Sequence, residues 1–390
     1  MGKNKIVITC AKGISPFLGE EVVSLGLPLL SENAAGVVTE GTIHDAMRLN
    51  LCVRTGHHVL FLFKEFSAAN PEELYRRASE IEWEEYIESD GYLCVTSSVE
   101  NSFIRDSRYA NVKCKDAIVD RISKKKRGRR PDSGPGRDRT VIFLYWKNEQ
   151  CSVYFDTSGE TLSRRGYRKI PMQAPMQETL AAAVVLASGW KGSGSYINPM
   201  CGSGTLAIEA ALIGLKRAPG LLRGNFGFMH LKGFDKSFWD DLRSRAMHNA
   251  ASTFQGKIIA TDISREAVRA ARENAAAAGV DDFIEFGVCD YSVTPVPEGR
   301  GVVVINPEYG ERMGTHGELE AIYKGIGDFF KTRCAGLTGY LFTGNLELAK
   351  KVGLRAKRRR QFFNGGIECR LLEYELYEGS RKSRNKEGER

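Results

Sequence analysis

The chain has 390 residues, of which 56 are Lys or Arg and 48 are Asp or Glu, so its formal net charge is +8. A hydrophobic content of 42% with 27% charged residues excludes wholesale disorder and allows two or three domains. No apolar run approaches the roughly 20 residues of a membrane span, and the first residues lack the pattern of a signal peptide. The nine cysteines are dispersed without a Cys-x-x-Cys pair, so we expect no metal site and a reducing, cytoplasmic location.

The first 160 residues predict an α+β region in which strands and helices come in mixed order. Apolar strand patterns alternate with helical ones, and the helices begin at capping residues such as Ser15 and Asn70. We expect strands at 5–10, 37–38, 59–63, 93–98, 140–146 and 151–156, and helices at 16–25, 43–51, 71–81 and 113–123.

Basic residues gather in four runs, at 124–139, 164–169, 355–360 and in the tail from 379. The first holds eight Lys or Arg residues, and its prolines and glycines predict a loop. The tail is polar and is predicted to be disordered. Any single run could be a solvated surface, but four on one chain favour a polyanionic partner that binds in a salt-dependent way.

The pattern becomes regular in the second half, after a linker-like stretch at 157–174 and a strong helix at 177–187. Strands and helices alternate there, which implies a parallel, doubly wound α/β sheet. Two last strand-like segments predict an antiparallel hairpin at its edge. We expect strands at 195–198, 258–262, 284–288, 302–306 and 340–343, helices at 206–215, 265–278 and 318–333, and the hairpin at 355–362 with 368–376.

A glycine-rich turn, 198–205, follows the first strand of this half and opens a helix. Gly202 and Gly204 would let the backbone turn tightly and approach a ligand. The spacing formally fits a dinucleotide fingerprint, but the next strand with its acid comes too late for an NAD site, and no P-loop Lys follows. A nucleotide site and a tight connection without a ligand both remain open.

Polar residues also end the following strands. Asp262 could accept both hydroxyls of a ribose or could cap the next helix, and Asp290 could accept an adenine amine or be a turn residue. Asn306 and Pro307, followed by Tyr309, offer two carbonyl acceptors for an amine and a ring that could stack on a flipped base. Ligands bind at the carboxyl ends of such strands, so the combination favours an active site over ordinary turns.

These motifs resemble the class I S-adenosyl-L-methionine-dependent methyltransferases that act on exocyclic amines, whose pattern is Asp-Pro-x-Cys-Gly-Ser-Gly-Thr followed by Asn-Pro-Pro-Tyr. The whole chain, over about 3–378, resembles the THUMP-containing RNA guanine-N2 methyltransferases, close to those of bacterial large-subunit ribosomal RNA. Further segments that match are 115–120, 156–160, 165–168, 174–182 and 364–369. Two positions depart from the pattern: Asn198 replaces the usual Asp, and Glu308 replaces the usual Pro.

The resemblance implies a Rossmann-like class I methyltransferase sheet with an antiparallel terminal hairpin, preceded by an α+β ferredoxin-like and THUMP region that binds RNA. It implies methyl transfer from S-adenosyl-L-methionine, with S-adenosyl-L-homocysteine as product, to the N2 amine of a guanine in 23S ribosomal RNA. A tRNA guanine, an adenine N6 amine and a non-catalytic assembly role remain alternatives. We expect RNA as the partner, no obligate protein partner, and no second methyltransferase module. The expected domains are 1–63 (ferredoxin-like), 64–160 (THUMP), 161–174 (linker), 175–378 (methyltransferase) and 379–390 (tail).

The same resemblance implies roles for individual residues. The target amine would be handled by Asn306, Pro307 and Tyr309. The methyl donor would be held by Thr179, Asn198, Pro199, Cys201, Gly202, Ser203, Gly204, Thr205, Asp262, Ile263, Asp290 and Tyr291. RNA would contact Lys124, Lys125, Lys126, Arg127, Arg129, Arg130, Arg164, Arg165 and Arg168, and no residue is expected to bind a metal.

Overall fold

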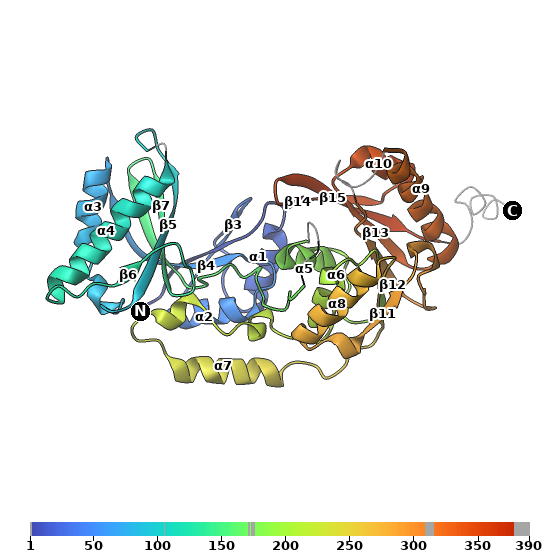
Figure 1. Cartoon of the computed structure of the whole chain (residues 1–390), viewed down its shortest axis with the longest axis horizontal. Coiled ribbons are helices and arrows are strands. Elements are labelled where there is room, and N and C mark those ends of the chain that lie inside the picture. The colour runs from blue at the N-terminus through green and yellow to red at the C-terminus, as the bar shows by residue number, and fades with distance from the viewer. Residues whose placement is uncertain (1, 105, 171, 173–175, 309–315, 378–390) are drawn as a thin grey trace. The chain divides into compact units, whose positions relative to one another are not determined.

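A computed structural model describes residues 2–104, 106–170, 172, 176–308 and 316–377 (Figure 1). The chain forms two compact units that do not follow chain order. The first contains Met1–Ala11, Leu18–Arg164 and Ala218–His248, and the second contains Lys12–Phe17, Arg165–Arg217 and the chain from Asn249 onward. No helix among the described residues is long and apolar enough to cross a membrane.

The first unit is built on an eight-stranded sheet with the order β2-β3-β1-β4-β8-β7-β5-β6. The strand β4 pairs antiparallel with β1 on one side and with β8 on the other. The two domains expected at 1–63 and 64–160 therefore share one continuous sheet. Its strands are β1 (Asn4–Thr9), β2 (Ser31–Asn33), β3 (Gly36–Gly41), β4 (His58–Ser67), β5 (Tyr92–Glu100), β6 (Asp132–Ser133), β7 (Thr140–Lys147) and β8 (Gln150–Asp156).

Helix α4 is the longest helix of this unit and is longer than the 113–123 expected. It begins after Asp106, whose side chain accepts a hydrogen bond from the backbone N–H of Arg108. Its buried residues recur at helical spacing, as in Ala110, Cys114 and Ala117. The prediction of a loop over 124–139 is wrong at two places, because α4 extends to Lys125 and residues 132–133 form β6. The helices mainly in this unit are α1 (Ser15–Ser24), α2 (Ile43–Cys52), α3 (Pro71–Ser79), η1 (Trp83–Glu85) and α4 (Ser107–Lys125).

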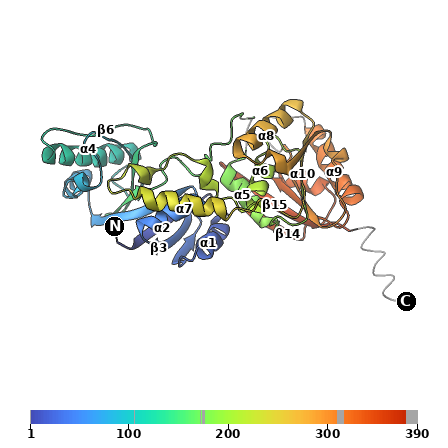
Figure 2. The same ribbon diagram turned by 90° about the horizontal axis from the view of Figure 1, so that it is seen from below.

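An insertion from the second half of the chain completes the first unit. Residues 218–248 form η2 (Pro219–Leu222), η3 (Gly227–His230) and α7 (Lys236–His248), which pack on α2 and on β7 and β8 (Figure 2). Buried rings of Phe226, Phe228 and Trp239 contact one another within this insertion. The predicted methyltransferase domain, 175–378, therefore contains a segment that belongs to the other unit, since it packs on α2, β7 and β8.

The second unit contains a seven-stranded sheet with the order β11-β10-β9-β12-β13-β15-β14. The first five of these strands are parallel, and β15 runs antiparallel to both β13 and β14. The predicted doubly wound sheet with an antiparallel terminal hairpin is thus confirmed. The strands are β9 (Ser195–Pro199), β10 (Ile258–Asp262), β11 (Ile284–Val288), β12 (Gly301–Ile305), β13 (Thr338–Thr343), β14 (Arg358–Asn364) and β15 (Ile367–Glu375).

Helices connect these strands and supply the core. Helix α6 packs on α5 and α8, and α9 packs on α10 (Figure 1). Side chains of α9 such as Tyr323 and Phe330 are fully buried against strand residues such as Val303 and Leu341. The helices are α5 (Glu178–Ala187), α6 (Thr205–Gly214), α8 (Arg265–Ala278), η4 (Asp281–Phe283), η5 (Tyr291–Val293), α9 (His316–Arg333) and α10 (Leu346–Lys351).

Candidate active site at the carboxyl ends of the second sheet

The predicted glycine turn lies directly between β9 and α6. Met200, Gly202 and Gly204 all have positive φ, at 56°, 54° and 82°. A Cβ at Gly204 would lie 2.9 Å from the Cβ of Ala271 on α8, so this glycine lets two helices approach closely. A Cβ at Gly202 would meet no atom within 4 Å. The turn is therefore packed on one side and open above Gly202, which leaves room for a ligand.

Asp262, at the end of β10, joins the turn to the next strand. One carboxylate oxygen accepts a hydrogen bond from the backbone N–H of Gly202, and the other accepts one from Ser264, both at 2.9 Å. The helix cap of α8 is Ser264 rather than Asp262. A carboxylate offers about four acceptor sites, so Asp262 keeps capacity for the hydroxyls of a ribose. Beside it, the apolar side chain of Ile263 is 72% exposed.

The end of β11 carries Asp290 and Tyr291, which the structure shows in local roles. Asp290 caps η5 by accepting the backbone N–H of Ser292 at 2.9 Å. The ring of Tyr291 packs edge-on against Phe329, and its hydroxyl donates to the carbonyl of Ile322 at 3.3 Å. Contact of either residue with a donor remains a prediction.

Two asparagines lie at the point where the strand order reverses, between β9 and β12. Asn198 is fully buried, and its side-chain nitrogen donates to the carbonyl of Val304 at 2.9 Å. The side-chain oxygens of Asn198 and Asn306 are buried and have no hydrogen-bond partner in the described part of the chain. A buried acceptor without a partner costs about 1–3 kcal/mol, so such atoms are suited to receive a ligand's N–H or O–H. The switch point of the sheet is where ligands of this fold class bind.

Residues 307 and 308 extend this site. Pro307 is buried, and the backbone carbonyl of Glu308 accepts the hydroxyl of Tyr323 at 3.4 Å. Loss of hydration raises the pKa of the Glu308 carboxyl, and the charge of Asp262 raises it further. The carboxyl groups at the ends of β10 and β12 therefore share one electrostatic environment. Tyr309 lies outside the described residues.

The remaining predicted donor residues are buried. Thr179 is fully buried on α5, and Pro199, Ser203 and Thr205 are also buried. Burial raises the pKa of the Cys201 thiol, and the nearby Asp262 adds to the effect. The raised pKa favours the protonated thiol, which argues against a nucleophilic role for Cys201, and its contact with the donor stays a prediction.

Asn274 on α8 is a supporting residue that the sequence patterns did not single out. Its side-chain oxygen accepts the backbone N–H groups of Lys169 and Ile170, at 2.7 and 3.0 Å, and its nitrogen donates to the carbonyl of Ser203 at 3.1 Å. It is 1% exposed. The signal for it was an asparagine on the alanine-rich face of an amphipathic helix, where a polar group needs partners.

The predicted RNA contacts divide into exposed and internal residues. Arg164 is exposed, although it pairs with Glu160 at 2.8 Å. The prediction for Arg165 is wrong, because this side chain is 1% exposed and its guanidinium pairs with buried Glu209 at 2.8 Å. Arg168 donates to Glu178 and to a backbone carbonyl, and so it is engaged inside the second unit. The other predicted RNA contacts of the first unit are also exposed: Lys124, Lys125, Lys126, Arg127, Arg129 and Arg130.

Comparison with protein families identifies the domains of the chain. Residues 165–373, more than half of the chain, match the RMKL-like methyltransferase domain. The chain belongs to this family. Residues 5–60 match the RlmL ferredoxin-like domain, and residues 68–156 match the THUMP domain. The predicted resemblance and fold class are both confirmed.

Individual relatives support the same assignment. The ribosomal RNA large subunit methyltransferase K/L of Syntrophotalea carbinolica is 38% identical over 96% of this chain and 54% of its own length. The chain thus spans about half the length of the first such relatives. A protein of Synechocystis is 33% identical over 95% of this chain and 96% of its own length. The crystal structure of SMU.472, complexed with SAH, superposes with a TM-score of 0.86 at 28% identity and covers 97% of this RMKL-like chain and 100% of its own.

Proposed function

We propose that this chain transfers a methyl group from S-adenosyl-L-methionine to the exocyclic N2 amine of a guanine in 23S ribosomal RNA. The observation that carries the proposal is the buried, unpartnered oxygen of Asn306 at the end of β12. An acceptor at that place fits the N–H of an amine. The names of the K/L relatives support ribosomal RNA as the substrate, the THUMP match supports RNA as the partner, and both fit a cytoplasmic protein.

The residues at the glycine turn fit the methyl donor. Gly202 leaves open space above the turn, and Asp262 retains acceptor sites for a ribose. Ile263 offers an exposed apolar side chain to an adenine ring. When bound, the donor supplies an electrophilic methyl group on a sulfonium. The SAH-bound relative, which aligns over nearly the whole chain, supports this assignment.

The target amine needs orientation more than activation, because its lone pair is conjugated into the base. The oxygen of Asn306 and the backbone carbonyl of Pro307 would accept its two N–H bonds and direct the lone pair toward the methyl group. The pyrrolidine ring of Pro307 restricts the backbone at this point. Tyr309 would stack on the base that has left its helix. Orientation and exclusion of water then supply the rate, without a covalent intermediate.

Mass spectrometry of nucleosides from a strain lacking the gene tests this function. We expect N2-methylguanosine to disappear from one position of 23S ribosomal RNA and to return with the intact gene. Loss from tRNA instead, or loss of N6-methyladenosine, would assign one of the two other substrates. Unchanged nucleosides, together with no binding of S-adenosyl-L-methionine to the purified protein, would leave only a non-catalytic role.

A further inference from the structure

Residues 165–170 form no helix or strand, yet buried side chains fix them to the second unit. The guanidinium of Arg165 donates to both oxygens of Glu209 on α6, at 2.8 and 3.2 Å, and the hydroxyl of Tyr167 donates to the same carboxylate at 3.0 Å. All three residues are at most 1% exposed. Loss of one partner would leave a buried charge uncompensated, so these contacts hold the segment against α6.

The same segment contacts two further helices. Arg168 donates to Glu178, at the start of α5, at 3.2 Å. The backbone N–H groups of Lys169 and Ile170 donate to the side-chain oxygen of Asn274 on α8, at 2.7 and 3.0 Å. The segment therefore joins α5, α6 and α8, and the last two helices begin just after the candidate donor residues at the ends of β9 and β10.

The side-chain amide of Asn274 uses every hydrogen-bonding site that it has. An asparagine amide offers two donors and two acceptor lone pairs. Its oxygen accepts the two N–H groups, and its nitrogen donates to the carbonyls of Ser203 at 3.1 Å and Ile170 at 3.2 Å. Because both donors and both acceptors are engaged, only an amide in this orientation satisfies all four partners.

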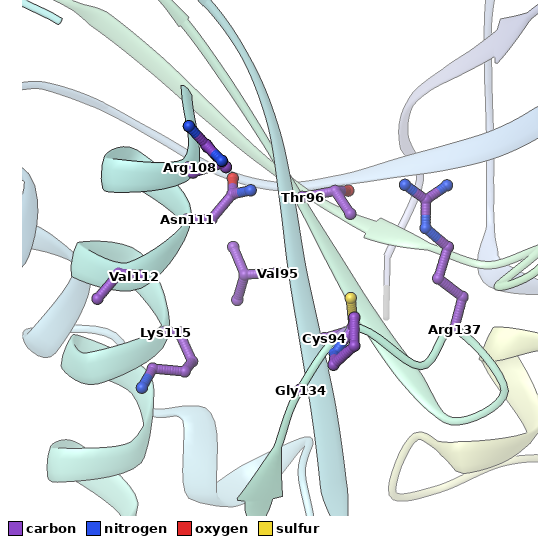
Figure 3. A pocket seen from close by; sticks show the side chains of 10 residues that line it. Cys94, Val95, Thr96, Arg108, Asn111, Val112, Lys115, Gly134 and Arg137 are labelled. Carbon is purple, nitrogen blue, oxygen red and sulfur yellow. The ribbon is translucent and has the colours of Figure 1, made fainter. Parts of the chain in front are cut away.

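Burial alone does not produce this state in the protein. Asn111 on α4 lines a cavity of about 360 Å³ in the first unit (Figure 3), and its buried side-chain oxygen has no partner among the described residues. The buried oxygens of Asn198 and Asn306 likewise lack a partner within the described ranges. The four bonds of Asn274 are therefore specific to its position between the segment 165–170 and the glycine turn.

One of these four bonds reaches the turn on which we expect the methyl donor. The carbonyl of Ser203 and the N–H of Gly204 belong to one planar peptide group. Asn274 holds the carbonyl of this group, and the carbonyl of Cys201 accepts its N–H at 2.9 Å. The peptide cannot rotate without breaking one of the two bonds, so Asn274 restrains the shape of the turn that a ligand meets.

We propose that Asn274 is a positioning residue for S-adenosyl-L-methionine. It holds the glycine turn in the conformation that binds the donor and ties the turn to the segment 165–170, so that both are ordered before the donor arrives. A loop that is already ordered loses less conformational entropy on binding, which raises affinity. The inference rests on the donor site of the proposed function and adds a residue that acts through Ser203.

Coupling of this kind is reciprocal, which gives a test on the unaltered protein. If the contacts of Asn274 favour the donor, the bound donor must favour those contacts by the same factor. We therefore expect S-adenosyl-L-homocysteine to slow hydrogen exchange of the Lys169 and Ile170 amides severalfold, measured by mass spectrometry on peptides that cover 165–170. Unchanged exchange at these amides in protein saturated with S-adenosyl-L-homocysteine would overturn the proposal.

Asn274→Asp separates the two sets of partners of this amide. A carboxylate of the same shape still accepts the N–H groups of Lys169 and Ile170, which favour its ionised form, but it cannot donate to the carbonyl of Ser203. At pH 8, calorimetry should show a Kd for S-adenosyl-L-homocysteine that is about tenfold higher, within the usual range of coupling between sites.

Steady-state kinetics of the same variant distinguish positioning from general damage to the fold. The KM for S-adenosyl-L-methionine should rise by a similar factor, whereas kcat at saturating donor should stay within twofold, because the groups that orient the amine are unaltered. A lower Tm of Asn274→Asp with an unchanged Kd would make Asn274 a purely structural residue and would overturn its positioning role.

Ala276→Glu is the matched control, since it adds a negative charge at an exposed position two residues further along α8. This variant should bind S-adenosyl-L-homocysteine as the unaltered protein does. Equal weakening in Ala276→Glu and Asn274→Asp would show that only the added charge matters, which contradicts the inference.

Failure of this inference and failure of the proposed function give different results. If Asn274→Asp weakens S-adenosyl-L-homocysteine binding but the strain lacking the gene keeps its N2-methylguanosine, the positioning role stands and the proposed substrate falls. If that strain loses N2-methylguanosine from 23S ribosomal RNA while Asn274→Asp binds S-adenosyl-L-homocysteine normally, the enzymatic proposal stands and the positioning role falls.

Discussion

Asn306 tests the amine pocket directly, because its oxygen is buried and unpartnered where the target amine would bind. We expect Asn306→Ala to lower kcat for methyl transfer about 10²–10³-fold, the usual effect of losing one positioned hydrogen-bonding group. Binding of S-adenosyl-L-homocysteine should be unchanged, since the glycine turn and Asp262 are intact. Single-turnover transfer to RNA and calorimetry with the product measure the two effects.

The control for Asn306 is Gln361→Ala, which removes an amide from an exposed position on β14. This variant should retain full activity. Full activity in Asn306→Ala would refute the amine pocket, whereas loss of product binding in that variant would place Asn306 in the donor site instead.

Glu308 gives a prediction that depends on pH. Its carboxyl pKa is raised by loss of hydration and then by Asp262, so the folded protein protonates this group at a higher pH than an unfolded chain does. The associated stability is present at low pH and is lost as the pH rises through the folded pKa. When ionised, Glu308 should favour the cationic sulfonium donor over the neutral product. We expect this preference to fall as the pH is lowered, starting above the usual range of a glutamate.

Calorimetry with S-adenosyl-L-methionine and S-adenosyl-L-homocysteine at several pH values measures that preference. Glu308→Gln should reduce it about fivefold or less, because a charge pair near water is worth about 1 kcal/mol. The variant should also remove its pH dependence. Glu347→Gln, at an exposed position on α10, is the control and should change neither. An unaltered preference in Glu308→Gln would show that this carboxylate does not interact with the sulfonium.

For single residues, the sequence predicts the position of those at strand ends better than the partners of those buried in the interior. Asp262 and Asn306 come at the ends of apolar strands of one parallel sheet. The alternation of strands and helices in the sequence is therefore enough to place both residues at the same edge of that sheet. Arg165 looked like a member of a basic run, and only tertiary packing shows its carboxylate partner, Glu209, 44 residues away. Asn274 was missed for the same reason, because its partners come from segments distant in the chain.

The turn between β9 and α6 gives a prediction at the scale of an element. Gly204→Ala should destabilise the second unit by about 2 kcal/mol, since it adds the strain of a left-handed residue to a contact with Ala271. Gly202→Ala adds comparable strain but no contact, and should cost about 1 kcal/mol. Thermal melting should therefore show a lower Tm for Gly204→Ala.

Ligand binding should order the two variants in the opposite way. We expect the donor in the space above Gly202. Gly202→Ala should therefore weaken the binding of S-adenosyl-L-homocysteine more than Gly204→Ala does. Identical melting of the two variants would remove the helix packing argument. Equal product binding would place the donor elsewhere than above Gly202.

Elements with a strong apolar period were predictable, and elements held by few contacts were not. The parallel strands β9, β10, β12 and β13 are almost entirely buried, and their alternation with helices in the chain predicted a parallel sheet. Helix α7 was not predicted, because only Trp239 and Leu242 of its 13 residues are buried. Strand β6 has two residues and exists only through its pairing with β5. Neither has a local pattern that the sequence could reveal.

Arg223 gives a prediction for the molecule as a whole. This side chain of the insertion is 8% exposed and donates to the backbone carbonyls of Ser158, Glu160 and Thr161, at 3.1, 2.9 and 2.6 Å. Arg223→Ala would leave buried acceptors unpaired and should destabilise the first unit by about 2–4 kcal/mol. Urea unfolding and faster hydrogen exchange at 158–161 measure this effect.

Arg223→Lys should recover little of this loss, because an ammonium cannot span carbonyls arranged for a planar guanidinium. The control is Arg243→Ala on α7, whose carbonyl contacts are longer, at 3.3 and 3.5 Å, and which should cost less than about 1 kcal/mol. Equal stability of the Arg223 and Arg243 variants would mean that the insertion does not depend on this hydrogen-bond network.

The predicted order of domains along the chain agrees only in part with the two units of the structure. Family matches at 5–60, 68–156 and 165–373 follow one another, as sequence patterns do. In the structure, β4 pairs with β8 and so joins the first two predicted domains in one sheet. Residues 218–248 belong to the first unit, although they lie within the predicted third domain. Such exchanges depend on contacts between segments far apart in the chain, which neither composition nor periodicity records.

The return of residues 218–248 has a consequence for the growing polypeptide. Chains emerge from the ribosome N-terminus first, and units generally fold as they become complete. The first unit cannot be complete until His248 has emerged, by which time β9 and α6 have already been made without β10, β12 or β13. Until then, α2, β7 and β8 lack the insertion that packs on them, and both edges of β9 lack their neighbouring strands. Both units are therefore incomplete during the same stretch of translation. A chaperone would be most needed in this interval.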